Sequence, residues 1–225
     1  MGKRQYQKPI KLSEWAYKSI KERIVNNEIT PGDQLNIEKL SDDMGISRTP
    51  IREALLRLLQ EGFVVSFSNV GFFVCGITRD DFDDIFELRQ LIEAYAVVRF
   101  IEKCKDHELL EVLEINKQCK EAAEAGDVKA FNSHDVELHG MFIKCLGNKK
   151  MRYIYDDVAD LLYRLRLYAL RSTENIKQSL IEHENLIHAI NEKDSVAGKL
   201  AMENHITNIR CRLEKFIDFE DEILR

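Results

Sequence analysis

The strongest constraint on the fold of this chain is a short amphipathic stretch that follows a turn near residue 45. In "GISRTPIREALLRLLQEGFV", residues 45–64, apolar side chains recur at the i, i+3, i+4, i+7 and i+8 spacing of one buried helix face. Gly45 suits a tight turn before this helix, and Gly62 suits a stop after it. The pattern therefore predicts a helix with one buried stripe, formed by Ile51, Ala54, Leu55, Leu58 and Leu59.

The segments on either side complete a small domain. "SEWAYKSIKERIVNNE" and "IEKLSDDM" have helical spacing and precede the turn. "FVVSF" and "GFFVCGI" are rich in β-branched and aromatic residues, and "SNV" separates them, so they predict a hairpin. Helix, helix, turn, helix and hairpin in this order predict a winged helix-turn-helix over residues 1–76.

From Thr78 onward no strand signal recurs. The spacing of apolar residues predicts helices near 80–104, 107–125, 128–146, 149–171, 174–192 and 195–222. Residues 77–225 should therefore form an all-helical bundle. The predicted fold class is mainly α, with a winged helix-turn-helix followed by this bundle.

The distribution of charge differs between the two predicted domains. Residues 1–76 carry 11 basic and 9 acidic side chains, whereas the remainder carries 22 and 30. The five cysteines form no CxxC pair, which predicts reduced thiols in a cytoplasm. Charged residues interrupt every apolar run, so no membrane-spanning helix is expected.

Arginines stand where a helix-turn-helix protein contacts DNA. The second helix of that motif enters the major groove, where Arg can bond guanine O6 and N7. Arg48 and Arg52 lie at the start of the helix, and Ser47 and Thr49 can bond phosphate or cap it, while Arg57 should reach only backbone or solvent. The alternative is a winged helix that contacts protein, with solvated arginines.

Polar residues interrupt the apolar stripes of the predicted bundle. Asp135 and His139 are four residues apart, so they project from one helix face and could share a metal. His183 and His205 each lie in the middle of an apolar stripe on a later helix. Each histidine alone could be a hydrogen-bonded core residue. Together the four residues suit a divalent transition metal such as Zn, Ni, Cu or Fe.

Arginines near these residues could bind an anion. Arg89 lies within an apolar stripe, and its guanidinium suits bidentate capture of a carboxylate. An internal ion pair with Glu93 is the equal alternative. Arg164 and Arg166 flank the stripe of "DLLYRLRLYAL" and are further candidates for contact with an effector.

The first domain resembles the DNA-binding head of the GntR family of bacterial transcription regulators. The stretch "IVNNEITPGDQLNIEKLSDDMGISRTPIREALLRLLQEGFV" and the later "GFFV" carry the resemblance. It implies a homodimer on a pseudo-palindromic operator in double-stranded DNA, contacted by Arg48, Thr49 and Arg52, with Ser47 and Gly71 in the same set. Many members carry an Arg in the helix before the turn where this chain has Glu38.

The second domain resembles the FCD ligand-binding domain of the FadR subfamily. "DVELHGMFIKCLGN", "IEHENLIHAI" and "AMENHI" place Asp135, His139, His183 and His205 at that family's metal-ligand positions. The resemblance implies a bound metal, with Zn or Ni favoured, at the base of a pocket for a small organic acid.

These observations predict a transcription regulator whose operator affinity changes when a carboxylate coordinates the metal. The resemblance to the family favours a repressor. A direct metal sensor is one alternative, and a metalloenzyme fused to a DNA-binding head is another. Catalysis is disfavoured, because Glu182 and Glu184 flank a ligand but lie off its stripe, which leaves no clear acid or base. The chain is therefore predicted not to be an enzyme.

Overall fold

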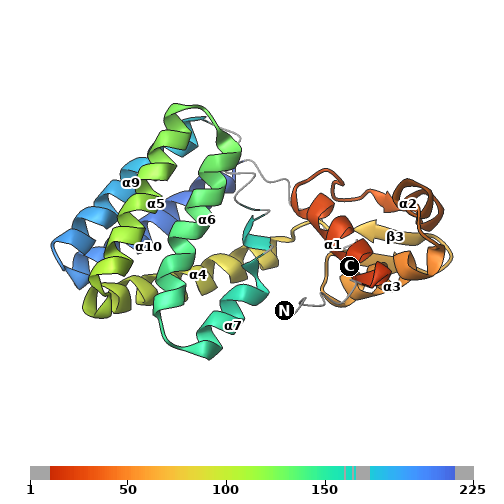
Figure 1. Cartoon of the computed structure of the whole chain (residues 1–225), viewed down its shortest axis with the longest axis horizontal. Coiled ribbons are helices and arrows are strands. Elements are labelled where there is room, and N and C mark those ends of the chain that lie inside the picture. Colours follow the sequence, from red (N-terminus) through yellow and green to blue (C-terminus); the bar gives the residue numbers. More distant parts are fainter. Residues whose placement is uncertain (1–10, 160, 164, 166–172, 216–225) are drawn as a thin grey trace, which may run out of the picture. The chain divides into compact units, whose positions relative to one another are not determined.

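The structure is a computed structural model that describes residues 11–159, 161–163, 165 and 173–215. The described chain divides into two units after Thr78 (Figure 1). The boundary predicted from the sequence lies after residue 76.

The first unit contains three helices: α1, Leu12–Val25; α2, Ile37–Met44; and α3, Arg48–Gln60. The turn between α2 and α3 is closed by Gly45, which has a left-handed φ of 65°. Asn36 caps α2 by accepting hydrogen bonds from two backbone N–H groups. The helix-turn-helix predicted from the sequence is confirmed.

A small antiparallel sheet completes the first unit. Strands β2, Val64–Phe67, and β3, Gly71–Val74, form the predicted hairpin, with Val64 opposite Val74. A short strand that the sequence did not predict, β1 at Gln34–Leu35, pairs with the other edge of β3. The wing is therefore three-stranded in the part of the chain that the structure describes.

The core of the first unit joins α1 to α3. Ile51, Ala54, Leu55 and Leu58 are buried as predicted, and Leu59 is partly buried against them. Arg57 does not point only to solvent. Its guanidinium lies 3.6 Å from the Tyr17 ring centroid on α1, and it forms ion pairs with Glu14 and Glu61. The contacts of Arg57 therefore stabilise the packing of α3 against α1.

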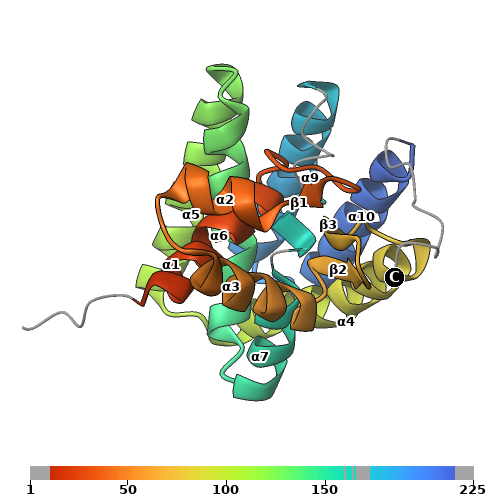
Figure 2. The ribbon, with the colours of Figure 1, turned by 90° about the vertical axis from the view of Figure 1, so that its right-hand side faces the viewer.

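The second unit is helical throughout its described length, so the mainly α fold class is confirmed. Its helices are α4, Arg79–Lys103; α5, Asp106–Glu124; α6, Val128–Cys145; α7, Lys149–Asp157; α9, Thr173–Asn191; and α10, Ser195–Leu213. Figures 1 and 2 show α5 beside α6 and α9 beside α10, and α4 packs against both α6 and α10. Side-chain caps from Asp127, Asn148 and Asp194 start three of these helices.

The sequence-based prediction of one continuous helix over 149–171 is wrong. The helix expected over 149–171 is interrupted, because α7 ends at Asp157 and Val158 lies in a turn. Helical structure resumes at Ala159 among the described residues. Tyr155 and Leu162, on either side of the break, are both buried, so the interruption keeps both segments packed on the bundle.

No described helix is both long enough and apolar enough to cross a membrane.

Candidate metal centre and DNA-reading surface

The four predicted ligands come together inside the second unit. Asp135 and His139 come from α6, His183 from α9 and His205 from α10. One ligand atom from each lies within 4.8 Å of those of the others. All four residues are buried, with Asp135 5% exposed and the three histidines at 0–1%.

The separations between the ligand atoms suit a small cation. His139 and His205 place their Nε2 atoms 3.2 Å apart, and Asp135 Oδ1 lies 3.4 Å from His183 Nε2 and 3.8 Å from His139 Nε2. Tetrahedral coordination with bonds of about 2.1 Å would separate neighbouring ligand atoms by about 3.4 Å. The spacing and the nitrogen–oxygen donor set therefore fit a divalent transition metal.

A carboxylate holds the outer nitrogen of His139. Glu93 of α4 accepts from His139 Nδ1, from Arg89 Nε at 2.7 Å and from the Tyr155 hydroxyl at 3.0 Å. Burial alone would raise the pKa of Glu93, but the charges of Arg89 and His139 outweigh it and hold that pKa well below its usual range. An ionised Glu93 fixes the tautomer that leaves Nε2 free to bind a metal.

A second carboxylate holds His205 in the same way. Glu182 of α9 accepts from His205 Nδ1 at 2.7 Å, and Arg212 of α10 pairs with both oxygens of Glu182 at 2.6 and 2.9 Å. Burial opposes the charged form, yet these hydrogen bonds lower the pKa of Glu182 to about 2. Burial, together with the other two histidines, lowers the pKa of His205 to about 3. The imidazole is therefore neutral at pH 7, as a ligand must be.

His183 differs from the other two histidines. Neither ring nitrogen has a hydrogen-bond partner among the described residues, although the ring is 0% exposed. A buried polar group without a partner is unfavourable. A metal bound to Nε2 would supply the interaction that this ring lacks.

Arg89 forms the internal ion pair that one of the two sequence-based alternatives predicted. It is 1% exposed, and its guanidinium contacts Glu93 and lies near the Phe86 ring. Its role in binding an effector stays a prediction. Arg164 and Arg166 lie outside the described residues.

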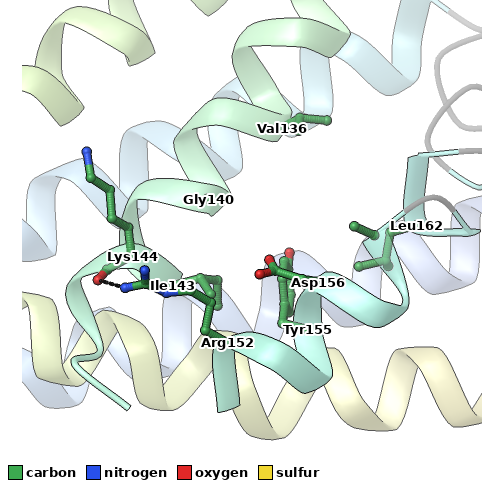
Figure 3. A pocket seen from close by; sticks show the side chains of 9 residues that line it. Val136, Gly140, Ile143, Lys144, Arg152, Tyr155, Asp156 and Leu162 are labelled. Atoms are coloured by element: carbon green, nitrogen blue, oxygen red, sulfur yellow. Dashed lines mark hydrogen bonds between the residues drawn. The ribbon is translucent and has the colours of Figure 1, made fainter. Parts of the chain in front are cut away.

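A cavity of about 250 Å³ lies between α6 and α7 (Figure 3). Tyr155 lines this cavity and also donates to Glu93, so it links the cavity wall to the support of His139. Arg152 donates to the Lys144 carbonyl at its edge. The other lining residues are Val136, Gly140, Ile143, Asp156, Ala159 and Leu162.

The predicted DNA-reading residues lie on the surface of the first unit. Ser47, Arg48, Thr49 and Arg52 are exposed at the start of α3, and the Ser47 side chain makes no capping hydrogen bond. Arg48 forms an exposed ion pair with Glu38 of α2 at 2.7 Å.

Gly71 opens strand β3 with a φ of 124°. A Cβ added there would lie 3.2 Å from Gln34 Nε2. The positive φ and the nearby Gln34 side chain therefore both favour glycine at this position.

The sequence pattern does not reveal that Glu93 and Glu182 support the candidate ligands. The sequence pattern indicates Glu93 only as a partner of Arg89, and Glu182 lies off the apolar stripe of α9. Glu182 contacts the ligand on the neighbouring helix instead of the ligand beside it in sequence. No periodicity within one helix signals such a contact.

Comparisons with known proteins agree with both units. Residues 84–208 match the FCD domain family, and residues 12–74 match the family described as bacterial regulatory proteins, gntR family. The HTH-type transcriptional regulator YdhC of Bacillus subtilis (strain 168) is 28% identical over 84% of this chain and 86% of its own. The gluconate operon transcriptional repressor of Bacillus licheniformis is 23% identical over 85% and 81%. The structure of E. coli McbR/YncC has a TM-score of 0.74 at 19% identity over 92% of this chain and 99% of that one.

The chain combines a winged helix-turn-helix, which is a DNA-binding motif, with a helical domain that contains a buried His/Asp cluster. The chain belongs to the GntR family of bacterial transcription regulators and carries an FCD domain, which is consistent with the FadR-type subfamily. It is a transcription regulator and not an enzyme.

Proposed function

We propose that this protein is a repressor whose operator affinity is controlled by a small organic acid bound at a divalent transition metal in the FCD domain. The observation that carries the proposal is the cluster of Asp135, His139, His183 and His205, whose ligand atoms all lie within 4.8 Å of one another. Within the cluster, His183 is 0% exposed and neither of its ring nitrogens makes a hydrogen bond among the described residues, which supports a metal as its partner.

The charges around the cluster favour an anionic effector. Glu93 is paired with Arg89, and Glu182 with Arg212, so both supporting carboxylates are already neutralised. A divalent ion held by Asp135 alone among the charged ligands would keep one uncompensated positive charge in a buried site. Such a charge is costly, and a carboxylate that completes the coordination removes the cost.

Zn and Ni are the proposed metals, because neutral imidazoles with one carboxylate suit both ions. Arg89 is a candidate second contact for the acid, with Arg164 and Arg166 as weaker ones. The repressor assignment is supported by the likeness to the gluconate operon transcriptional repressor.

The proposed mechanism is reciprocal coupling between effector and operator. A homodimer would place two α3 helices on a pseudo-palindromic operator. Arg48, Thr49 and Arg52 would contact the bases of each half-site, and Ser47 and Gly71 would lie near the sugar–phosphate backbone of the DNA. An acid that favours one arrangement of the two winged helices would change operator affinity by a coupling free energy of about 1–3 kcal/mol. The protein would act in the cytoplasm, where its operator lies.

The test separates an effector-responsive regulator from a direct metal sensor. Operator duplexes selected from a random pool are titrated with metal-loaded and chelated protein, each with and without candidate acids. We expect added acid to change the affinity of the metal-loaded protein only. A change on chelation alone would instead support direct metal sensing.

Two variants and a matched control complete the experiment. Asp135→Ala and His183→Ala should abolish the response to acid and keep the basal DNA affinity, because α3 lies in the other unit. His188→Ala is the control, since His188 is exposed on α9 and outside the cluster. A normal response in the Asp135 and His183 variants would show that the site is assigned to the wrong residues.

A further inference from the structure

Glu38 is an acidic residue beside the predicted DNA-reading arginines of the first unit. It lies in the first turn of α2, and its carboxylate forms an ion pair at 2.7 Å with Arg48, the first residue of α3. A carboxylate is unfavourable close to the phosphates of DNA, because both groups are negatively charged. Its presence at this surface therefore requires an explanation.

The place of Glu38 in α2 is fixed by a helix cap. Asn36 Oδ1 accepts hydrogen bonds from the backbone N–H groups of Glu38 and Lys39 at 2.9 and 3.0 Å. The side chains of Glu38 and Arg48 are 65% and 68% exposed, so both can contact a ligand. The ion pair brings the Glu38 carboxylate to the start of α3, the end of a recognition helix that meets base edges.

The four bases differ in what they offer a carboxylate in the major groove. Cytosine presents the N4 amine, which donates, whereas guanine presents O6 and N7 and thymine presents O4, which only accept. Adenine presents the N6 amine next to the acceptor N7, and an ionised carboxylate has no hydrogen for that acceptor. Cytosine is therefore the base that pairs best with a glutamate.

The spacing of the ion pair suits two successive base pairs. Neighbouring bases along one strand are about 3.4 Å apart. The guanidinium nitrogen of Arg48 and the carboxylate oxygen of Glu38 are 2.7 Å apart. A guanidinium has five N–H donors, and a guanine uses two of them. Arg48 can therefore bond a guanine and keep its contact with Glu38 while the carboxylate accepts from the adjacent base pair.

We propose that Glu38 is a specificity-determining residue that accepts a hydrogen bond from the N4 amine of a cytosine in the base pair next to the guanine read by Arg48. The inference rests on the proposed function, since it assumes that Arg48 contacts a guanine of the operator. A guanine or thymine in place of that cytosine sets an acceptor against the carboxylate, which makes these bases unfavourable.

The experiment selects DNA duplexes from a random pool with the full-length protein at fixed salt and measures the base preference at every position. Arg48→Ala identifies the guanine, because that is the position at which this variant loses its preference. In the adjacent base pair we expect the wild type to prefer cytosine over guanine and thymine by about fivefold or more.

Two substitutions change the chemistry of Glu38 in different ways. Glu38→Gln should move the preference from cytosine to adenine, because a glutamine amide can pair with both N6 and N7 of adenine. Glu38→Ala should reduce the preference in that base pair to less than about twofold. The preferences at base pairs further from the guanine should stay as in the wild type.

The control variant is Asp43→Asn, which removes one negative charge from the same helix. Asp43 is exposed and follows Glu38 by five residues, so it lies about 140° around α2 from Glu38. It should keep the preference of the wild type for cytosine. Loss of that preference in Asp43→Asn as well would show an effect of net charge and overturn the inference.

A stability measurement separates base recognition from a structural role. An acidic residue in the first turn of a helix is favourable, because it lies near the positive end of the helix dipole. Both Glu38 variants should therefore melt no more than about 5 °C below the wild type. A larger fall, or base preferences that stay unchanged, would assign Glu38 to the stability of α2 and overturn the inference.

The remaining outcomes separate this inference from the proposed function. If both Glu38 variants change the affinity equally for all sequences, or if the wild type shows no preference for cytosine beside the guanine, the role of Glu38 is wrong while operator recognition through Arg48 stands. If the wild type enriches no sequence from the pool, the proposed operator recognition is overturned and this inference with it.

Discussion

The two units place their functional side chains in opposite environments. Arg48 in the first unit has 68% of its side chain exposed, whereas the side chains of the four candidate metal ligands of the second unit are at most 8% exposed. Arg48 has one exposed partner, Glu38, and such ion pairs contribute little to folding. Two of the metal ligands, His139 and His205, are held by carboxylates from other helices, the buried Glu93 and the partly buried Glu182.

This difference determines how each unit should respond to change. A surface side chain can be removed with little effect on packing, so the effect falls on binding. A buried polar side chain affects binding and stability together, because its removal or the loss of its metal leaves neighbours without partners.

The largest effect is expected at the DNA-reading surface. Arg48→Ala should weaken operator binding by about 1–3 kcal/mol for each half-site, and by twice that in a dimer that uses both. The melting temperature should not change. Titration of fluorescent operator DNA at fixed salt checks the affinity, and calorimetry checks the stability.

Arg57→Ala provides the contrasting variant within the same helix. Arg57 stacks on Tyr17 and pairs with Glu14 and Glu61, so its loss should destabilise the first unit by about 1 kcal/mol. DNA affinity should change much less than in Arg48→Ala. Trp15, the single tryptophan of the chain, lies on α1 and reports unfolding of this unit by fluorescence. Equal loss of DNA affinity in both variants would contradict the division between reading and packing arginines.

Metal removal should produce the largest effect in the second unit. Metal that binds only the folded state stabilises it by about 4 kcal/mol when its free concentration is a thousand times the Kd. Chelation should therefore lower the melting temperature of the second unit by roughly 10 °C, and His183→Ala should remove most of the difference. Scanning calorimetry with zinc, nickel or chelator measures the shift. Identical melting with and without metal would exclude a metal bound at this cluster.

The sequence predicted those features that repeat within one helix. The stripe of α3, the pairing of Asp135 with His139 and the histidines within the stripes of α9 and α10 all follow from helical spacing. The short strand β1 was missed because two residues carry no periodic pattern. The break at Val158 was also missed, since neither glycine nor proline marks it.

Contacts between helices could not be predicted in this way. Glu182 lies off the apolar stripe of α9. Its carboxylate nevertheless contacts His205 on α10, a residue 23 positions further along the chain. Glu93 likewise supports His139 across the interface between α4 and α6. Which carboxylate meets which imidazole depends on how the helices pack, and one sequence does not specify that packing.

Glu182→Gln tests whether the supporting carboxylates matter. Loss of the Glu182 carboxylate should weaken metal binding by about 10- to 100-fold, because the amide of glutamine orients and polarises His205 less well. Competition with a metal-binding dye gives the affinity. Glu184→Gln is the matched control, since Glu184 is exposed on the same helix and only approaches Lys120 at 3.9 Å. If both variants bind metal equally well, the contact between Glu182 and His205 has no role in holding the ion.

The smallest effect is expected from acid titration of the first unit. Glu61 accepts hydrogen bonds from Tyr17, Lys21 and Arg57. Burial alone would raise its pKa, but the contacts with Lys21 and Tyr17 outweigh burial and lower it below the ordinary value.

Because the folded-state pKa of Glu61 is depressed, its contribution to stability is complete above the unfolded pKa of about 4.3 and is lost as pH falls through the folded value. Glu61→Gln should therefore destabilise the first unit by no more than about 1 kcal/mol at pH 7, since Glu61 is partly exposed. The difference should shrink as pH falls below about 4. Urea unfolding followed by Trp15 fluorescence at pH 7 and pH 3.5 measures both values, with Glu53→Gln on the exposed face of α3 as the control. A difference that grows toward low pH would mean that the protonated form of Glu61 is the stabilising one, which its three donors argue against.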